Sequence, residues 1–373
     1  MVKVFLDGVI NMIRIKNLEL KVPIIQGGMG VGVSLGHLAG AVAKNGGMGV
    51  ISTVNAAYRE PDFETDTLNA NLRVLKNEIE YALNEAAGNG IVAINAMVAV
   101  NNYEITVKTA IEAGVQAVIS GAGLPVNLPE LVKGYDVAIA PIVSSGKAAR
   151  IILKGWDKNY QVTPDFLVIE GPMAGGHLGF KKDDLINGTY QSVDEILPDV
   201  LEEINPYEEK YGRKIPVFVA GGVFDGHDMK RLIEKGASGV QIATRFIATE
   251  ECDASSEYKR RIIEAKKEDA VLVPSPVGLP GRALKNSLIE KVLNKKEEDA
   301  PILKALHCNL CIKTCPHGDK IPYCISRALI EAVKGNFEDG LFFCGANVGR
   351  INRMYTVKEL MDEIMAEYIG DSV

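Results

Sequence analysis

The chain has 373 residues, of which 47% are hydrophobic and 24% are charged, and it carries a formal net charge of −7. This composition is typical of a soluble globular protein with a large core, and it excludes a disordered chain. The chain has no dense run of lysine and arginine, no apolar segment long enough to span a bilayer and no secretory signal. We therefore expect a cytoplasmic protein with no nucleic-acid partner and no membrane partner.

The first predicted elements are a strand, a helix and a second strand. Residues 22–30 are an apolar run that ends in glycines, which predicts a short buried strand and a tight turn. Ser34 can then cap a helix with one apolar face, and Gly46 and Gly47 end it. The same alternation continues along the chain. Strands are predicted at residues 22–30, 48–52, 91–95, 117–120, 137–141, 166–169, 215–220 and 239–242.

Eight short apolar strands separated by helical patterns predict an α/β protein with an all-parallel sheet. An open doubly wound sheet is the alternative, but the first turn, residues 26–30, lacks the G-x-G-x-x-G spacing of that fold. We therefore predict a (β/α)8 TIM barrel over residues 1–250. Residues 251–373 are predicted to form a helical C-terminal extension, with a cysteine-rich segment, that packs on the barrel.

The last predicted helix begins at Thr356, and Glu359 completes a capping box with it. One face of this helix is apolar from Val357 to Tyr368. The barrel or a second copy of the chain could cover that face. A homodimer is therefore one expectation from the sequence.

Two glycine-rich loops follow the last two predicted barrel strands. Gly221 and Gly222 leave backbone N–H groups unobstructed after the seventh strand, and Gln241 to Thr244 add amides and a hydroxyl after the eighth. TIM barrels commonly hold phosphate at these positions. The pair of loops therefore predicts a phosphate cradle, although tight packing alone explains either loop separately.

A third glycine-rich loop surrounds a histidine. The strand at residues 166–169 runs into Glu170 and then into Gly175, Gly176 and His177. The glycines would let a flat ligand come close, and imidazole exchanges a proton near neutral pH. The alternative is a glycine-rich turn with a solvated histidine. In a barrel, this loop would lie at the catalytic rim.

Residues 23–30, 120–123, 170–179, 219–226 and 239–246 resemble, in order, the motifs of the nitronate monooxygenase family, formerly called 2-nitropropane dioxygenases. They are also similar to the related flavin-dependent enoyl-acyl-carrier-protein reductase II. Both resemblances imply an FMN-binding barrel. Two departures are Ala243, where relatives often have glycine, and Pro172-Met173, where an acidic residue is frequent. These positions bear on the substrate more than on flavin binding.

The resemblance also implies roles for particular residues. His177 would be the base near the substrate. The flavin and its phosphate would lie against Gln26, Gly27, Gly28, Asn95, Glu170, Gly175, Gly176, Gly221, Gly222, Gln241, Ala243 and Thr244.

The expected activity is oxidation of a small molecule, an alkyl nitronate or nitroalkane, to a carbonyl compound and nitrite. One alternative is an NAD(P)H-dependent reductase like enoyl-acyl-carrier-protein reductase II. Another is a non-redox lyase or isomerase that grips a phosphorylated substrate and uses Glu170 with His177 as acid and base. All three place the reaction at the same rim of the barrel.

Four of the six cysteines are crowded near the C-terminus. Cys308, Cys311, Cys315 and Cys324 have the spacing C-x2-C-x3-C-x8-C, which is close to that of four-iron clusters and compatible with zinc. Reduced, buried thiols are the other interpretation. Beyond them, residues 340–350 resemble the family segment that closes over the flavin.

Overall fold

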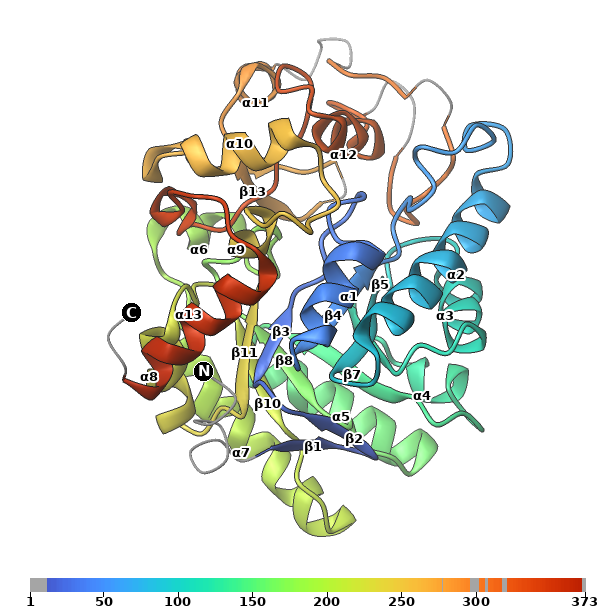
Figure 1. The fold of residues 1–373 in the computed structure, drawn as a ribbon, viewed down its shortest axis with the longest axis vertical. Helices are drawn as coiled ribbons and strands as arrows, with labels where there is room; N and C mark the ends of the chain where they lie inside the picture. Colours follow the sequence, from blue (N-terminus) through green and yellow to red (C-terminus); the bar gives the residue numbers. More distant parts are fainter. Residues whose placement is uncertain (1–11, 277, 296–301, 306–307, 317–320, 371–373) are drawn as a thin grey trace.

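The structure, a computed structural model, describes residues 12–276, 278–295, 302–305, 308–316 and 321–370. Eight parallel strands close into a barrel in the order β10-β11-β3-β4-β5-β6-β7-β8. Helices surround them (Figure 1), so the predicted (β/α)8 barrel with a helical C-terminal part is confirmed. The barrel strands are β3 (Ile24–Gln26), β4 (Met48–Ser52), β5 (Ile91–Met97), β6 (Ala117–Gly121), β7 (Ala138–Val143), β8 (Leu167–Glu170), β10 (Val217–Ala220) and β11 (Gly239–Ile242).

The barrel strands are apolar on both faces because both faces are covered. Alternate side chains along a strand point in opposite directions. In β4 and β5, Val50 and Ala93 pack inside the barrel, while Ile51 and Ile94 pack in the layer beneath the helices. This double burial explains why short, nearly continuous apolar runs were sufficient to predict all eight strands.

Polar residues mark where several outer helices begin. The Ser145 hydroxyl accepts a hydrogen bond from the Ala148 N–H at the start of α5, and Ser192 forms a capping box with Glu195 in α7. Among the described residues, no helix is long and apolar enough to cross a membrane. The helices around the barrel are α1 (Gly36–Lys44), α2 (Thr67–Ala86), α3 (Tyr103–Glu112), α4 (Leu128–Leu131), α5 (Gly146–Tyr160), α6 (Lys182–Asn187), α7 (Val193–Tyr211), α8 (Gly226–Glu234) and α9 (Thr244–Ile247).

An antiparallel hairpin that the strand prediction missed precedes the barrel. Its strands are β1 (Ile13–Ile15) and β2 (Leu18–Leu20), and they lie at the end of the barrel opposite the C-terminal helices (Figure 1). Ile15 and Leu20 are fully buried and join the interior cluster of the barrel. The hairpin therefore plugs the amino-terminal end of the barrel.

The C-terminal part returns to the opposite end, where the strands terminate (Figure 1). It contributes two strands to a small antiparallel sheet of order β12-β13-β9, in which β9 (Gly176–His177) belongs to the histidine loop. The elements of this part are α10 (Ser256–Glu264), the 3-10 helix Lys267–Asp269, β12 (Ala270–Pro274), β13 (Pro280–Leu284), α11 (Ser287–Asn294), α12 (Ile325–Lys334), the 3-10 helix Val348–Arg350 and α13 (Val357–Ile369).

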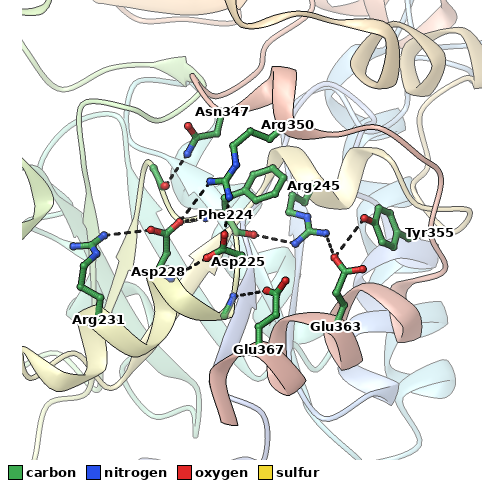
Figure 2. Close-up of polar contacts among 12 residues, drawn as sticks. Phe224, Asp225, Asp228, Arg231, Arg245, Asn347, Arg350, Tyr355, Glu363 and Glu367 are labelled. Atoms are coloured by element: carbon green, nitrogen blue, oxygen red, sulfur yellow. Dashed lines mark hydrogen bonds and ion pairs between the residues drawn. The ribbon is translucent and has the colours of Figure 1, made fainter. Parts of the chain in front are cut away.

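Helix α13 lies beside the barrel against α8, α9 and α1. The predicted capping box of Thr356 and Glu359 is present, and the apolar stripe is buried in the main core cluster. The buried Arg245 guanidinium donates to Glu363 at 2.5 Å, and Glu367 accepts from the Gly226 N–H at 2.8 Å (Figure 2). The apolar face of α13 is thus covered by the barrel of the same chain.

Close approach of α1 to β4 requires a glycine at position 49. A Cβ atom there would lie 1.8 Å from the Ala39 carbonyl oxygen, so Gly49→Ala is expected to lower the free energy of unfolding by about 3 kcal/mol or more. Gly155 in α5 has nothing within 4 Å of an added Cβ, so Gly155→Ala should be neutral or stabilising by up to about 1 kcal/mol. Urea unfolding of both variants tests this packing, and equal effects would contradict it.

Candidate active site

A cavity of about 480 Å³ opens at the carboxyl ends of the barrel strands. This volume is within the range of roughly 300–1,000 Å³ that is usual for cofactor and small-ligand sites. Strand tips from all around the barrel contribute to it, and so does the C-terminal part. The residues predicted from the sequence that line it are Gly27, Gly28, Asn95, Glu170, Gly175, Gly176, His177, Gly221, Gly222, Gln241, Ala243 and Thr244.

Gln26 is placed differently from the other predicted residues. Its side chain is fully buried between β3 and β4, where its amide accepts from the Val50 N–H at 2.9 Å and donates to the Gly27 carbonyl at 2.5 Å. It does not line the cavity. In this structure, Gln26 links β3 to β4 by hydrogen bonds directly beneath the rim.

Two glycines at the rim make room for neighbouring groups. A Cβ atom on Gly28 would lie 2.4 Å from the Cβ of Asn95, so the side chain of Asn95 occupies the space that Gly28 leaves. Gly27 donates its N–H to the Ile242 carbonyl at 2.9 Å, where β3 meets β11. The first loop of the barrel is therefore shaped by packing against the third and eighth strands of the barrel.

The two loops for which a phosphate cradle is predicted follow β10 and β11, which are neighbouring strands. Gly221 and Gly222 have φ angles of 84° and 118°, which L-residues with side chains rarely adopt. The Thr244 hydroxyl oxygen accepts from the Gly345 N–H at 2.9 Å, so its own proton is available to a ligand. The two loops and the C-terminal part thus meet at one end of the cavity.

The C-terminal part holds the cradle through side chains (Figure 2). Asn347 donates to the Gly222 carbonyl at 2.8 Å, and Arg350 pairs with Asp225 at 2.6 Å. The Arg350 guanidinium also lies over the Phe224 ring at 3.9 Å from its centroid. Because these contacts fix the loop that follows Gly221 and Gly222, the cavity is complete only with the C-terminal part in place.

His177 lines the cavity on β9. Its Nε2 atom is 2.8 Å from the Ser275 hydroxyl, and the edge of its ring packs on Phe343 at a centroid distance of 5.3 Å. Burial lowers the pKa of His177 to about 4, because the charged imidazolium loses its hydration. The imidazole is therefore neutral at pH 7 and can accept a proton.

Glu170 ends β8 and lines the same cavity. Burial raises the pKa of Glu170 to about 7, because the carboxylate loses its hydration. His177 and Glu170 are thus shifted in opposite directions by the same cause. Perturbed groups of this kind, placed together in a cleft, are typical of catalytic sites.

Sequence reasoning missed residues from the turn and strand after Pro274. Ser275 contacts His177, and Arg282 donates to the Pro172 and Ala174 carbonyls at 2.8 and 2.6 Å. Both residues are about a hundred positions from the groups that they contact. Only the pattern of two short apolar runs around residues 270–284 hinted at a hairpin there.

The cysteine-rich segment docks on the loop that follows β5. Asn101 donates its N–H to the Cys311 carbonyl at 3.1 Å, and Cys311 and Cys315 pack against a satellite apolar cluster. Burial raises the pKa of the Cys311 thiol to about 11. In the described ranges, no three His, Cys, Asp or Glu side chains are grouped as metal ligands. An iron–sulfur or zinc site at Cys308, Cys311, Cys315 and Cys324 stays a prediction from their spacing.

A closed parallel barrel with a cavity at the carboxyl ends of its strands defines the class of TIM-barrel enzymes. The chain belongs to the nitronate monooxygenase family, whose model matches residues 11–367. It is therefore an oxidoreductase of a flavin-dependent family. This excludes the non-redox lyase or isomerase considered from the sequence.

The sequence identities between this chain and individual relatives are low. A probable nitronate monooxygenase of Staphylococcus saprophyticus is 27% identical over 76% of this chain and 81% of its own. A (3aS,4S,5R,7aS)-5-hydroxy-7a-methyl-1-oxo-octahydro-1H-indene-4-carboxyl-CoA dehydrogenase of Mycobacterium tuberculosis is 24% identical over 93% of both chains. FabK from Thermotoga maritima shares the fold with a TM-score of 0.67, 24% identity and 94% coverage of both chains. A nitroalkane oxidase of Streptomyces ansochromogenes has a TM-score of 0.66, 19% identity and coverage of 93% and 96%.

The raised pKa of Glu170 predicts a pH-dependent stability. A carboxyl group with a pKa of 4.5 when unfolded and about 7 when folded stabilises the fold below pH 4.5, and this stabilisation is lost as pH rises through 7. The total is about 3 kcal/mol. Glu170→Gln should abolish this loss in the flavin-free protein. Urea unfolding at pH 5 and pH 8 measures it, with Glu64→Gln as an exposed control, and identical pH dependence in wild type and Glu170→Gln would refute it.

Proposed function

We propose that the chain is an FMN-dependent nitronate monooxygenase that oxidises alkyl nitronates or nitroalkanes to a carbonyl compound and nitrite, with molecular oxygen as the oxidant. The observation that carries this proposal is the imidazole of His177 on the wall of the cavity, with its Nε2 atom 2.8 Å from the Ser275 hydroxyl. The lowered pKa of His177 supports its role as a proton acceptor. FMN would supply the redox chemistry when bound. Thr244, Gly221 and Gly222 would hold its phosphate.

The fit of FMN to the site rests on several observations. The left-handed glycines and the available Thr244 proton suit a phosphate at one end of the cavity. Gly27, Gly28, Gly175 and Gly176 line the cavity and offer backbone there, against which a flat ring can pack. Asn95 and Glu170 would lie near the ring, as the resemblance implies. Gln26 would support the rim from below.

The protein residues would bind the substrate and move its proton. In a neutral nitroalkane, the α C–H bond breaks, the proton passes to the imidazole of His177, and the electron pair delocalises into the nitro group. A nitronate already lacks that proton. His177 is therefore needed as a base for the neutral nitroalkane but not for the nitronate.

A second candidate is the oxidation or reduction of an acyl thioester. The observation in its favour is the match to the mycobacterial carboxyl-CoA dehydrogenase, which extends over 93% of both chains and so includes the C-terminal part of the site. The staphylococcal relative matches only 76% of this chain. Turnover of acyl-CoA substrates by the purified protein would favour this candidate, and NAD(P)H consumption with enoyl thioesters would indicate a reductase.

Loss of the Thr244 hydroxyl is expected to weaken FMN binding. A hydrogen bond to a charged phosphate contributes about 1.5–3 kcal/mol, so Thr244→Val should raise the Kd of FMN about tenfold or more. Flavin fluorescence titration of the apoprotein measures this Kd, with the exposed Thr189→Val as a matched control. Failure of the wild-type apoprotein to bind FMN would overturn the proposed cofactor.

Replacement of His177 tests the proposed base. His177→Gln is expected to lower kcat/KM for neutral nitroethane by about a hundredfold or more, while oxidation of preformed ethyl nitronate changes much less. Oxygen consumption and nitrite release measure both reactions. Because the pKa of His177 is about 4, the wild-type rate with nitroethane should persist below pH 6. Equal rates of His177→Gln and wild type with nitroethane would exclude His177 as the base.

A further inference from the structure

The backbone of His177 is held by the C-terminal part. Strand β9 pairs with β13, with His177 opposite Gly281 and Gly176 opposite Arg282. The Leu178 N–H donates to the Pro280 carbonyl at 2.8 Å. A hairpin from a distant part of the sequence therefore sets the position of the histidine Cα atom.

The same hairpin provides the polar contact to the ring. Ser275 lies in the turn between β12 and β13, and its hydroxyl is 2.8 Å from His177 Nε2. The edge contact with Phe343 restricts rotation of the ring from another side. In the described part of the chain, no hydrogen-bond partner contacts Nδ1. That nitrogen is the one left for a ligand in the cavity.

We propose that Ser275 is a positioning residue, whose hydroxyl accepts the Nε2–H of His177 and so keeps the lone pair on Nδ1 for the α-proton of the substrate. This inference rests on the role proposed for His177. A neutral imidazole has one N–H and one lone pair, so a hydrogen bond at one nitrogen selects the function of the other. The proton taken from carbon would bind at Nδ1, and Ser275 would stay bonded to Nε2–H throughout.

Arg282 supports the same loop in a different way. It is 8% exposed, and its guanidinium donates to the Pro172 and Ala174 carbonyls rather than to the ring. It therefore fixes the backbone before the histidine. Ser275 is the polar side chain that contacts the imidazole itself, so its removal should change the ring and leave the loop in place.

The kinetic test compares two substrates. Ser275→Ala is expected to lower kcat/KM for neutral nitroethane about tenfold, to leave oxidation of ethyl nitronate within about twofold of wild type, and to leave flavin content unchanged. Ser275→Thr, which keeps the hydroxyl, should retain most of the wild-type rate with nitroethane. Ser326→Ala is the matched control, because it removes a hydroxyl with a 2.6 Å contact to Asn55, far along the chain from His177.

The outcomes separate this inference from the proposed function. If both substrates slow equally in Ser275→Ala, or neither slows, the positioning role is overturned while the proposed base stands. If His177→Gln equals wild type with nitroethane, the proposed base fails, and if wild type oxidises neither nitro compound, the proposed function fails. In a His177→Gln background, Ser275→Ala should have no additional effect on nitroethane turnover, because the ring that it positions is gone.

A spectroscopic test needs no turnover. The chain has five histidines, so the His177 ring can be assigned in a ¹⁵N-histidine NMR spectrum by its loss in His177→Gln. Wild type should show the proton on Nε2, and Ser275→Ala should show a mixture of both tautomers. A proton on Nδ1 in wild type, or an unchanged spectrum in Ser275→Ala, would overturn the inference whether or not nitro compounds are substrates.

Discussion

Closure of the barrel between β11 and β3 is the constraint on which the rest of the structure depends. Ile242 pairs with Gln26, and the Gly27 N–H donates to the Ile242 carbonyl at 2.9 Å. Because all eight strands are parallel, closure brings every carboxyl end to one rim. The loops after the first and last strands thereby become neighbours, although more than two hundred residues separate them.

The C-terminal part is an integral component of this rim. It supplies Gly345 and Asn347, which contact Thr244 and Gly222, and it supplies the strand that holds His177. Helix α13 anchors it through the buried pair of Arg245 and Glu363 (Figure 2). Arg245 is buried, so loss of Glu363 would remove a carboxylate partner from a buried charge, and this contact couples α13 to α9.

Burial without charged partners gives the cavity its chemical character. Glu170 and His177 both lose hydration, and the loss favours the neutral form of each. A cavity whose imidazole is neutral and whose carboxyl group is only partly ionised at pH 7 can accept an uncharged substrate without a large desolvation cost. It also keeps His177 available as a proton acceptor, which the proposed chemistry requires.

The sequence by itself determined the eight barrel strands and the capped last helix. Of the thirteen residues that it predicts for cofactor binding and catalysis, twelve line the cavity and one lies beneath it. Short apolar runs, capping residues and glycines at strand ends are local signals, and the rules for barrels translate them into positions at one rim. The one that lies beneath is Gln26, which sits next to residues that do line the cavity. The orientation of the Gln26 side chain depends on a hydrogen bond that it accepts from the Val50 N–H on the neighbouring strand.

Only the tertiary structure decided the contacts between distant segments. The pairing of Gly281 with His177, the contact of Ser275 with the imidazole and the docking of α13 beside α1 and α8 leave no local periodicity in the sequence. The apolar side chains of the β1–β2 hairpin are buried because they cover the open amino-terminal end of the barrel. Each of these depends on which surfaces meet after the chain has folded, and that is a property of packing between segments rather than of any one of them.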